Sequence, residues 1–332
     1  MMTLIILIIA LALLFDFLNG MNDAANSIAT IVSTRVLSPR AAVLWAAFFN
    51  VVAAFGFGVG VAKTIGKGIV DVAIVDQYLI LAALIGAIIW TEVCTRYGLP
   101  ISVSHALIGG LAGSGIAKAG VGSLILPGLM KVTLFIFLSP LLGLVMGYLL
   151  MVMVSWGARR LSPNRVDRTF RIGQLISSAA YSLGHGTNDA QKTMGIIALV
   201  LYTGGFLGDT FYVPTWVILS AHLAIGMGTY LGGWKVVRTM GMKLTHLRPV
   251  GGFCAETSSA ILLFGTAAAG IPVSTTHTIA GAIMGVGSTR RVSAVRWGIA
   301  GKIVAAWVFT IPAAAGVAAL TFYLIEGVRL IF

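Results

Sequence analysis

Charged side chains and cysteines are both scarce in this sequence of 332 residues. Asp, Glu, Lys and Arg make up only 10% of the chain, whereas 58% of the residues are hydrophobic. A soluble globular protein is about one quarter charged, so an ordinary soluble enzyme is excluded, and a disordered chain would be poor in apolar residues. The two cysteines, Cys94 and Cys254, lie in apolar segments and cannot supply a disulfide framework or a cysteine metal site.

Long apolar runs are what the sequence has instead, with a mean hydropathy of +0.99. A membrane-spanning helix needs about 20 apolar residues, and continuous runs argue against the alternating pattern of a membrane β-barrel. We therefore predict an all-α polytopic membrane protein with about 10–12 membrane segments. Ten apolar segments are visible, at 3–34, 41–62, 77–95, 99–117, 131–156, 173–203, 214–234, 250–268, 272–288 and 303–328.

The excess of positive charge predicts the orientation of the chain. Lys and Arg outnumber Asp and Glu by 22 to 10, and in a membrane protein basic loops stay on the cytoplasmic side. We therefore expect a lipid bilayer, not nucleic acid, as the partner. Basic residues gather at 159–171, 235–248 and 290–302, which we expect to be cytoplasmic. The loops at 63–76 and 204–213, and both chain termini, are then external in the inner membrane.

Two motifs recur in the same order in the two halves of the chain. Gly-Met-Asn-Asp-Ala at 20–24 returns as Gly-Thr-Asn-Asp-Ala at 186–190, and Gly-Leu-Pro-Ile-Ser-Val-Ser-His at 98–105 returns as Gly-Ile-Pro-Val-Ser-Thr-Thr-His at 270–277. The charge count gives the copies opposite directions, which is the inverted-topology repeat of secondary transporters with broken or re-entrant helices. We predict a first repeat at 1–156, a basic cytoplasmic linker at 157–172 and a second repeat at 173–332. The long segments 3–34 and 173–203 are expected to break at Asn-Asp.

The Asn-Asp pairs predict cation chemistry. A charged side chain at the centre of a membrane costs at least about 2.5 kcal/mol, so Asp23 and Asp189 must line a cavity, bind a cation or accept a proton. Carboxylate and amide oxygens are hard ligands that suit Na⁺, which makes a Na⁺ site of Asn22, Asp23, Asn188 and Asp189. Glu256 is also acidic inside an apolar segment, and we expect it to take part in cation coupling.

The Pro-x-Ser segments predict an anion site. Pro100 and Pro272 can each start a helix in its first turn, and a helix N-terminus presents free N–H groups to anions. We expect an oxyanion to contact these ends together with the Asn-Asp pairs. Protonated phosphate suits this site better than sulfate because it can donate a hydrogen bond to a carboxylate. The phosphate-binding residues are then Asn22, Asp23, Ser102, Ser104, Asn188, Asp189, Ser274, Thr275 and Thr276, followed by His105 and His277 as a proton relay.

At these motifs the chain resembles the inorganic phosphate transporter (PiT) family, in particular its bacterial low-affinity permeases. The family blocks Gly-x-Asn-Asp-x-x-Asn and Pro-[Ile/Val]-Ser-Thr-Thr-His correspond here to 20–26, 186–192, 100–105 and 272–277. The resemblance implies phosphate uptake coupled to Na⁺ or H⁺, with Asn26 at the cation site and no other cofactor. It also implies a homodimer and, for bacterial relatives, a soluble PhoU-like accessory protein.

Four positions depart from or extend the family pattern. Val103 replaces a Thr, and Lys192 stands where the first repeat has Asn26, so it can pair with Asp189 three residues earlier. Asn50 replaces a Glu of animal members, whereas Glu256 keeps the other such Glu.

Alternative functions are open at this stage. They are a sulfate or thiosulfate permease of the same fold, an anion channel, and a membrane enzyme that uses the adjacent Ser-His or Thr-His residues. Neighbouring residues on a helix diverge by about 100°, so we expect no enzyme.

Overall fold

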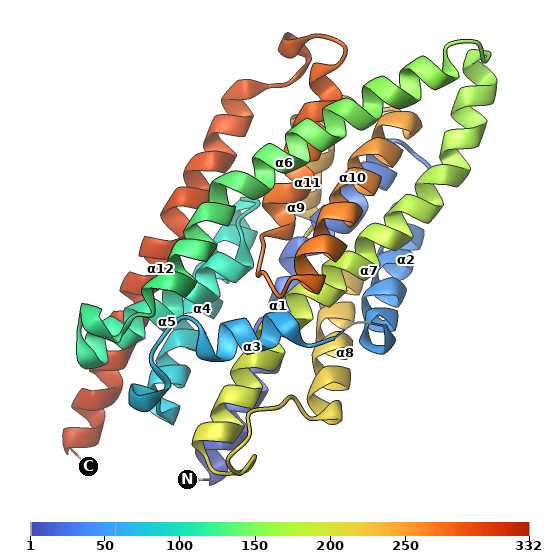
Figure 1. Cartoon of the computed structure of the whole chain (residues 1–332). Coiled ribbons are helices and arrows are strands. Elements are labelled where there is room, and N and C mark those ends of the chain that lie inside the picture. Colours follow the sequence, from blue (N-terminus) through green and yellow to red (C-terminus); the bar gives the residue numbers. More distant parts are fainter. Residues whose placement is uncertain (1, 57, 332) are drawn as a thin grey trace.

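The computed structural model describes residues 2–56 and 58–331, and within these ranges all regular secondary structure is helical. Twelve α-helices follow one another along the described chain (Figure 1). They are α1 (Met2–Ser33), α2 (Pro39–Val52), α3 (Gly60–Lys67), α4 (Gln77–Tyr97), α5 (Val103–Ala119), α6 (Leu126–Ala158), α7 (Pro163–Thr203), α8 (Thr215–Leu231), α9 (Trp234–Arg238), α10 (Pro249–Ala268), α11 (Thr275–Ser288) and α12 (Trp297–Ile331). Short helical turns are η1 (Ala53–Phe55), η2 (Val72–Ile74), η3 (Val121–Ser123), η4 (Thr239–Lys243) and η5 (Val292–Ala294).

The predicted helix breaks at the Asn-Asp pairs are wrong, because α1 and α7 run through them without interruption. An Asn or Asp breaks a membrane helix only when its polar groups take partners away from the backbone ladder. Here Asn188 donates to the carbonyl of Gly184 one turn back in its own helix, at 2.9 Å. The bends lie elsewhere: 85° between α2 and α3, and 63° between α8 and α9.

Membrane-spanning length and apolar composition are found together in α1, α4, α6, α10 and α12. Each bent pair, α2 with α3 and α8 with α9, can add one more span, which gives up to seven in the described residues. Helices α5 and α11 are shorter, with 17 and 14 residues, and both follow non-helical Pro-x-Ser segments. They enter the protein interior rather than facing lipid, because nearly all of their residues are buried.

The contacts between helices repeat when the two halves are exchanged. Helix α11 packs on α6 as α5 packs on α12, and α10 packs on α7 as α4 packs on α1. Helix α8 likewise packs on α1 as α2 packs on α7. Helices α1 and α7 contact each other at the centre and run in opposite directions in Figure 1, as an inverted repeat requires.

Both chain ends lie at the same end of the molecule, opposite the connection between α6 and α7 (Figure 1). That connection contains only residues 159–162 outside helices. The remaining part of the expected linker, 163–172, forms the first turns of α7. The helix begins there because Pro163 occupies its first turn, where a missing N–H costs nothing.

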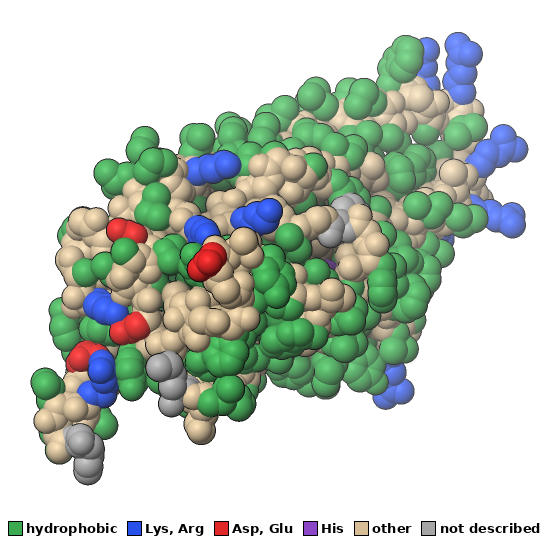
Figure 2. Space-filling view, turned by 60° about the horizontal axis from the view of Figure 1, so that its bottom comes forward, with side chains coloured by type: hydrophobic (Ala, Val, Ile, Leu, Met, Phe, Trp, Pro, Cys, Tyr) green, Lys and Arg blue, Asp and Glu red, His purple; other side chains and the backbone are tan. Residues whose placement is uncertain are grey.

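Hydrophobic side chains cover much of the outer surface, and a group of Lys and Arg side chains lies at one end (Figure 2). Phe137 and Leu141 on α6 are 64% and 56% exposed, and Phe309 on α12 is 65% exposed. Exposed apolar surface of this extent is unstable in water and fits contact with lipid tails. Polar side chains are concentrated instead in the buried centre, where α1, α7 and α11 meet.

Candidate functional site

The two aspartates of the repeated motifs come together at the N-terminus of α11. The Thr275 hydroxyl lies 2.9 Å from Oδ2 of Asp189 and 3.4 Å from Oδ2 of Asp23. Both carboxylates and the hydroxyl are buried. Two aspartates that are 166 positions apart in sequence therefore lie next to one donor; whether they form a joint binding site stays a prediction.

The hydroxyl of Thr276, also on α11, contacts both Asp23 and Asn26, so Asn26 of the first motif belongs to the same centre. The Thr276 hydroxyl donates to Oδ1 of Asp23 at 3.2 Å and accepts from the Asn26 amide at 2.9 Å. Asn26 and Asp23 lie on the same face of α1 because they are three residues apart. The first Asn-Asp-x-x-Asn block thus contacts the second Pro-x-Ser block, across the two halves.

Lys192 provides the positive charge in this buried centre. Its ammonium pairs with Asp189 and donates to the Ser104 hydroxyl and, at 3.0 Å, to the carbonyl of Val273. The side chain is only 1% exposed. The expected pairing of Lys192 with Asp189 is confirmed, and Ser104 joins the centre from the first half.

His185 lies at the centre although sequence reasoning gave more weight to other histidines. Its Nε2 is 3.2 Å from Oδ2 of Asp189 and 3.9 Å from Oδ2 of Asp23, and its Nδ1 is 3.1 Å from Oδ1 of Asn50. The signal in the sequence was its position four residues before Asp189, which places both side chains on one helix face. Ligand atoms of Asp23, His185 and Asp189 all lie within 4.8 Å of one another.

His105 and His277, the expected proton relay, lie side by side behind the Pro-x-Ser segments. Their ring centroids are 4.8 Å apart, and the His277 ring stacks on Trp307 at 3.8 Å. Trp307 in turn donates to the carbonyl of Pro100 at 2.9 Å. The two copies of the motif therefore meet directly, through packed rings.

Ser102 and Ser274 are helix caps, so the expected position of the prolines in the first helical turn is wrong. The Ser102 hydroxyl accepts from the N–H of His105 at 3.3 Å, and the Ser274 hydroxyl accepts from the N–H of His277 at 3.2 Å. Gly98 and Gly270 end the preceding helices with φ of 67° and 63°, which only glycine adopts easily. The chain then continues without helix through the prolines, and the helix starts after the serine.

The motif asparagines leave acceptor atoms unpaired. Asn22 donates to Thr95 at 2.7 Å, and Asn188 donates to two backbone carbonyls, one of them that of Leu263. Within the described residues, the Oδ1 atoms of Asn22, Asn26 and Asn188 are buried without a hydrogen-bond partner. Buried orphan acceptors cost free energy unless a donor or a cation satisfies them. The donor set therefore fits the hard oxygen ligands of Na⁺.

Glu256 lies in a separate polar cluster. Its carboxylate accepts from the Thr30 hydroxyl at 2.6 Å, the Gln174 amide at 3.0 Å and the Ser177 hydroxyl at 2.5 Å. Gln174 also accepts from the Thr34 hydroxyl at 2.8 Å. The structure thus places Glu256 near the C-terminal end of α1, apart from the contacts that join Asp23 to Asp189.

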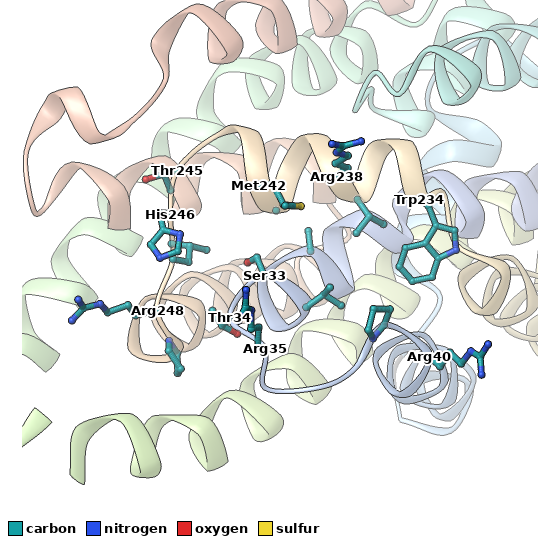
Figure 3. A pocket seen from close by; sticks show the side chains of 17 residues that line it. Ser33, Thr34, Arg35, Arg40, Trp234, Arg238, Met242, Thr245, His246 and Arg248 are labelled. Carbon is teal, nitrogen blue, oxygen red and sulfur yellow. The ribbon is translucent and has the colours of Figure 1, made fainter. Parts of the chain in front are cut away.

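Thr34 belongs to the wall of a cavity of about 1060 Å³. Figure 3 shows this cavity between the end of α1, the start of α2, the α9–η4 segment and the start of α10. Four arginines border it, namely Arg35, Arg40, Arg238 and Arg248. Thr30 follows Asn26 by four residues on α1, and Thr34 follows Thr30 by four residues just beyond the end of the helix, so a row of polar residues leads from the carboxylate centre toward this cavity.

Together, the inverted helical halves and a buried polar centre built from both define a membrane transport protein. The chain belongs to the phosphate transporter family, whose model matches residues 19–318. The resemblance inferred from the repeated motifs is therefore confirmed.

Named relatives match along nearly the whole length. A probable low-affinity inorganic phosphate transporter of Rhizobium meliloti (strain 1021) is 58% identical over 320 residues, covering 96% of each chain. A probable low-affinity inorganic phosphate transporter of Bacillus subtilis (strain 168) is 42% identical over 328 residues, covering 98% of each chain. A solved structure described as the sodium-dependent phosphate transporter has a TM-score of 0.90 and 26% identity, and the match covers 98% of this chain and 99% of that one.

Proposed function

We propose that the protein imports inorganic phosphate by symport with a cation, with alternating access to the centre where α1, α7 and α11 meet. The observation that carries this proposal is the Thr275 hydroxyl facing both Asp23 and Asp189, with Lys192 and Ser104 beside them. Hydroxyl and ammonium groups donate to phosphate oxygens, and carboxylates accept from its protonated oxygen. The names of the relatives support phosphate, and the name of the structural neighbour supports Na⁺ as the coupling ion.

Charge balance explains the coupling. Asp23 and Asp189 carry two negative charges, and Lys192, with His185 when it is protonated, supplies at most two positive charges. A phosphate adds one or two further negative charges, and unit charges at contact distance repel by several kcal/mol at the effective dielectric of a protein. At least one cation must therefore accompany the anion. This mutual requirement makes each ligand raise the affinity of the other, which is the thermodynamic basis of symport.

The polar row along α1 supplies a release path in this proposal. Asn26, Thr30 and Thr34 lead from Asp23 past Glu256 to the arginine-bordered cavity. Glu256 accepts only from neutral donors in its cluster, so it can exchange one of them for a cation. The basic cavity then attracts the anion on the cytoplasmic side.

The layout in the membrane is part of the same proposal. We propose that the end that carries the α6–α7 connection faces the cytoplasm, at the bacterial inner membrane, because basic loops stay on that side; both termini, at the opposite end, then face outward. In this proposal the two repeats are the two halves of the protein between which the centre opens, first to one side of the membrane and then to the other. A homodimer, a PhoU-like accessory protein and a relay through His105 and His277 remain expectations from the sequence.

Uptake into proteoliposomes tests the function. The purified protein should accumulate radiolabelled phosphate against its gradient when a Na⁺ or a H⁺ gradient is imposed, each in turn. Sulfate and thiosulfate should not compete at equal concentration. Preferred accumulation of sulfate would identify the alternative permease, and flux that ignores both cation gradients would identify a channel. The variant Glu256→Gln should keep phosphate binding but change the cation dependence of uptake, because it removes only the charge.

A further inference from the structure

Helix α1 carries a continuous buried polar stripe, and its first two members lie outside the site described above. The stripe consists of Asp16, Asn19, Asp23, Asn26 and Thr30 on one face of α1, and of Thr34 directly after the helix; they follow one another at intervals of three or four residues. All six side chains are buried. Asp16 and Asn19 extend the stripe from the carboxylate centre toward the end of the molecule that carries both termini.

Asp16 is a buried carboxylate whose oxygens have no hydrogen-bond partner. The side chain is 0% exposed, and within the described residues neither Oδ1 nor Oδ2 has a partner. The side chains of Asn19 and, on α7, Thr193 are close enough to interact with this carboxylate, but neither interaction has the geometry of a hydrogen bond. Oδ1 of Asn19 and the Thr193 hydroxyl are buried and unpartnered in the same way. Four orphan oxygens from three side chains therefore point to a missing positive group.

Neither of the nearby basic side chains, Lys192 and His185, pairs with Asp16. Lys192 donates to Asp189, Ser104 and Val273, and His185 contacts Asp189, Asp23 and Asn50. Leaving a charged group buried and unpaired is strongly destabilising. A cation held by a carboxylate, an amide oxygen and a hydroxyl removes this penalty.

We propose that Asp16, Asn19 and Thr193 form a further Na⁺ site, between the carboxylate centre and the end of the molecule that carries both termini. The three oxygen types are hard ligands that suit Na⁺ and leave soft transition metals at a disadvantage. The proposal rests on phosphate transport at the centre, to which this site adds one coupling ion. Occupation of this site lowers the negative potential that an entering phosphate meets at Asp23.

The test measures phosphate uptake in proteoliposomes as a function of Na⁺ concentration. Asp16→Asn keeps the shape of the side chain but removes the charge. Half-saturating Na⁺ should rise at least about tenfold, and the Hill coefficient for Na⁺ should fall. Phosphate affinity at saturating Na⁺ should stay within about twofold of the wild-type value, because the residues at the centre are untouched. Thr193→Val should raise half-saturating Na⁺ by about threefold to tenfold.

Thr203→Val is the matched control on the same helix. Its hydroxyl donates to the carbonyl of Leu199 within α7, so its Na⁺ dependence should equal that of the wild type. An unchanged Na⁺ curve in Thr193→Val and in folded Asp16→Asn overturns the site. A shift confined to the pH dependence in Na⁺-free buffer also overturns it, because Asp16 then binds a proton. If the wild type takes up no phosphate, the proposed function fails instead.

Discussion

Replacing Lys192 by Asn tests whether a built-in charge substitutes for a coupling ion. Asn26 is the equivalent residue of the first repeat, so Lys192→Asn makes the two Asn-Asp-x-x-Asn blocks alike. In the native protein the ammonium is buried and bound to Asp189 and Ser104. The shorter, neutral side chain leaves Asp189 without its ion-pair partner and opens space for a cation.

The size of the effect follows from burial of the pair. Removing one partner of a buried ion pair typically costs about 3–5 kcal/mol. A Na⁺ ion that takes the place of the ammonium must supply this free energy, and about 3 kcal/mol corresponds to roughly 150-fold in an equilibrium constant. We therefore expect uptake by Lys192→Asn to collapse at low Na⁺ and to recover at high Na⁺, with a Hill coefficient raised by about one.

Phosphate uptake by proteoliposomes over a wide range of Na⁺ concentrations measures both the Na⁺ concentration that uptake requires and the Hill coefficient for Na⁺. Lys118→Asn is the matched control, because Lys118 pairs with Asp76 at 2.6 Å near the surface, with side chains 26% and 35% exposed. Surface pairs contribute at most about 1 kcal/mol, so its Na⁺ curve should match the wild type. An unchanged curve for folded Lys192→Asn would refute the argument that Lys192 replaces a cation.

Three further tests, which use three substitutions and two cysteine labels, address the site, the packing and the orientation. Thr275→Val should weaken phosphate binding about 5- to 150-fold, whereas Ser274→Ala should chiefly lower thermal stability, by about 1 kcal/mol for a lost cap. Gly20→Ala should lower the unfolding temperature because its Cβ would lie 2.1 Å from a backbone oxygen of α8, an overpacking cost of about 1–3 kcal/mol. A cysteine at Asp209 should react with an impermeant reagent from outside, and one at Arg165 should not.

Each of these three tests has one outcome that would contradict the prediction. Equal phosphate affinities in Thr275→Val and the wild type would remove this hydroxyl from the anion site. A Gly20→Ala protein with unchanged unfolding temperature would show that α1 and α8 can separate without cost. Labelling at 165 but not at 209 in intact cells would reverse the orientation.

The sequence predicts the spans well because the physical signal is long and simple. Each of the ten apolar segments corresponds to a helix or a bent helix pair, but within the described residues only five helices, or seven spans with the two bent pairs, are long and apolar enough to cross a membrane. The site motifs can be recognised in the sequence because a carboxylate inside an apolar segment costs free energy, and because the Asn-Asp motif occurs in both halves of the chain. The contact between Asp23 and Thr275 could not be predicted from the sequence, because it depends on how two distant segments pack against each other.

The incorrect predictions concern residues that are compatible with two different local backbone conformations. An Asn-Asp pair in a membrane helix can unwind it or be accommodated within it, and the hydrogen bond from Asn188 to Gly184 shows that the helix here accommodates it. A proline can open a helix or precede its cap, and the left-handed Gly98 and Gly270 favour the second arrangement. His185 is not singled out by the sequence pattern, because two of its three partners, Asp23 and Asn50, lie on other helices.

Equivalent positions of α1 and α7 carry different charged side chains, so the two repeats contribute unequally to the charge of the centre. With the offset that aligns Gly20 with Gly186, the α1 residues Asp16, Asn19, Asp23 and Asn26 align with Ser182, His185, Asp189 and Lys192. The α1 set contains two carboxylates and no base, whereas the α7 set contains one carboxylate and two basic side chains. Protein groups therefore supply the positive charge on the α7 side of the centre, and under the proposed symport we expect mobile cations to supply it on the α1 side. We therefore expect the coupling ions of the proposed symport to bind chiefly to the first half, although the fold itself is symmetric.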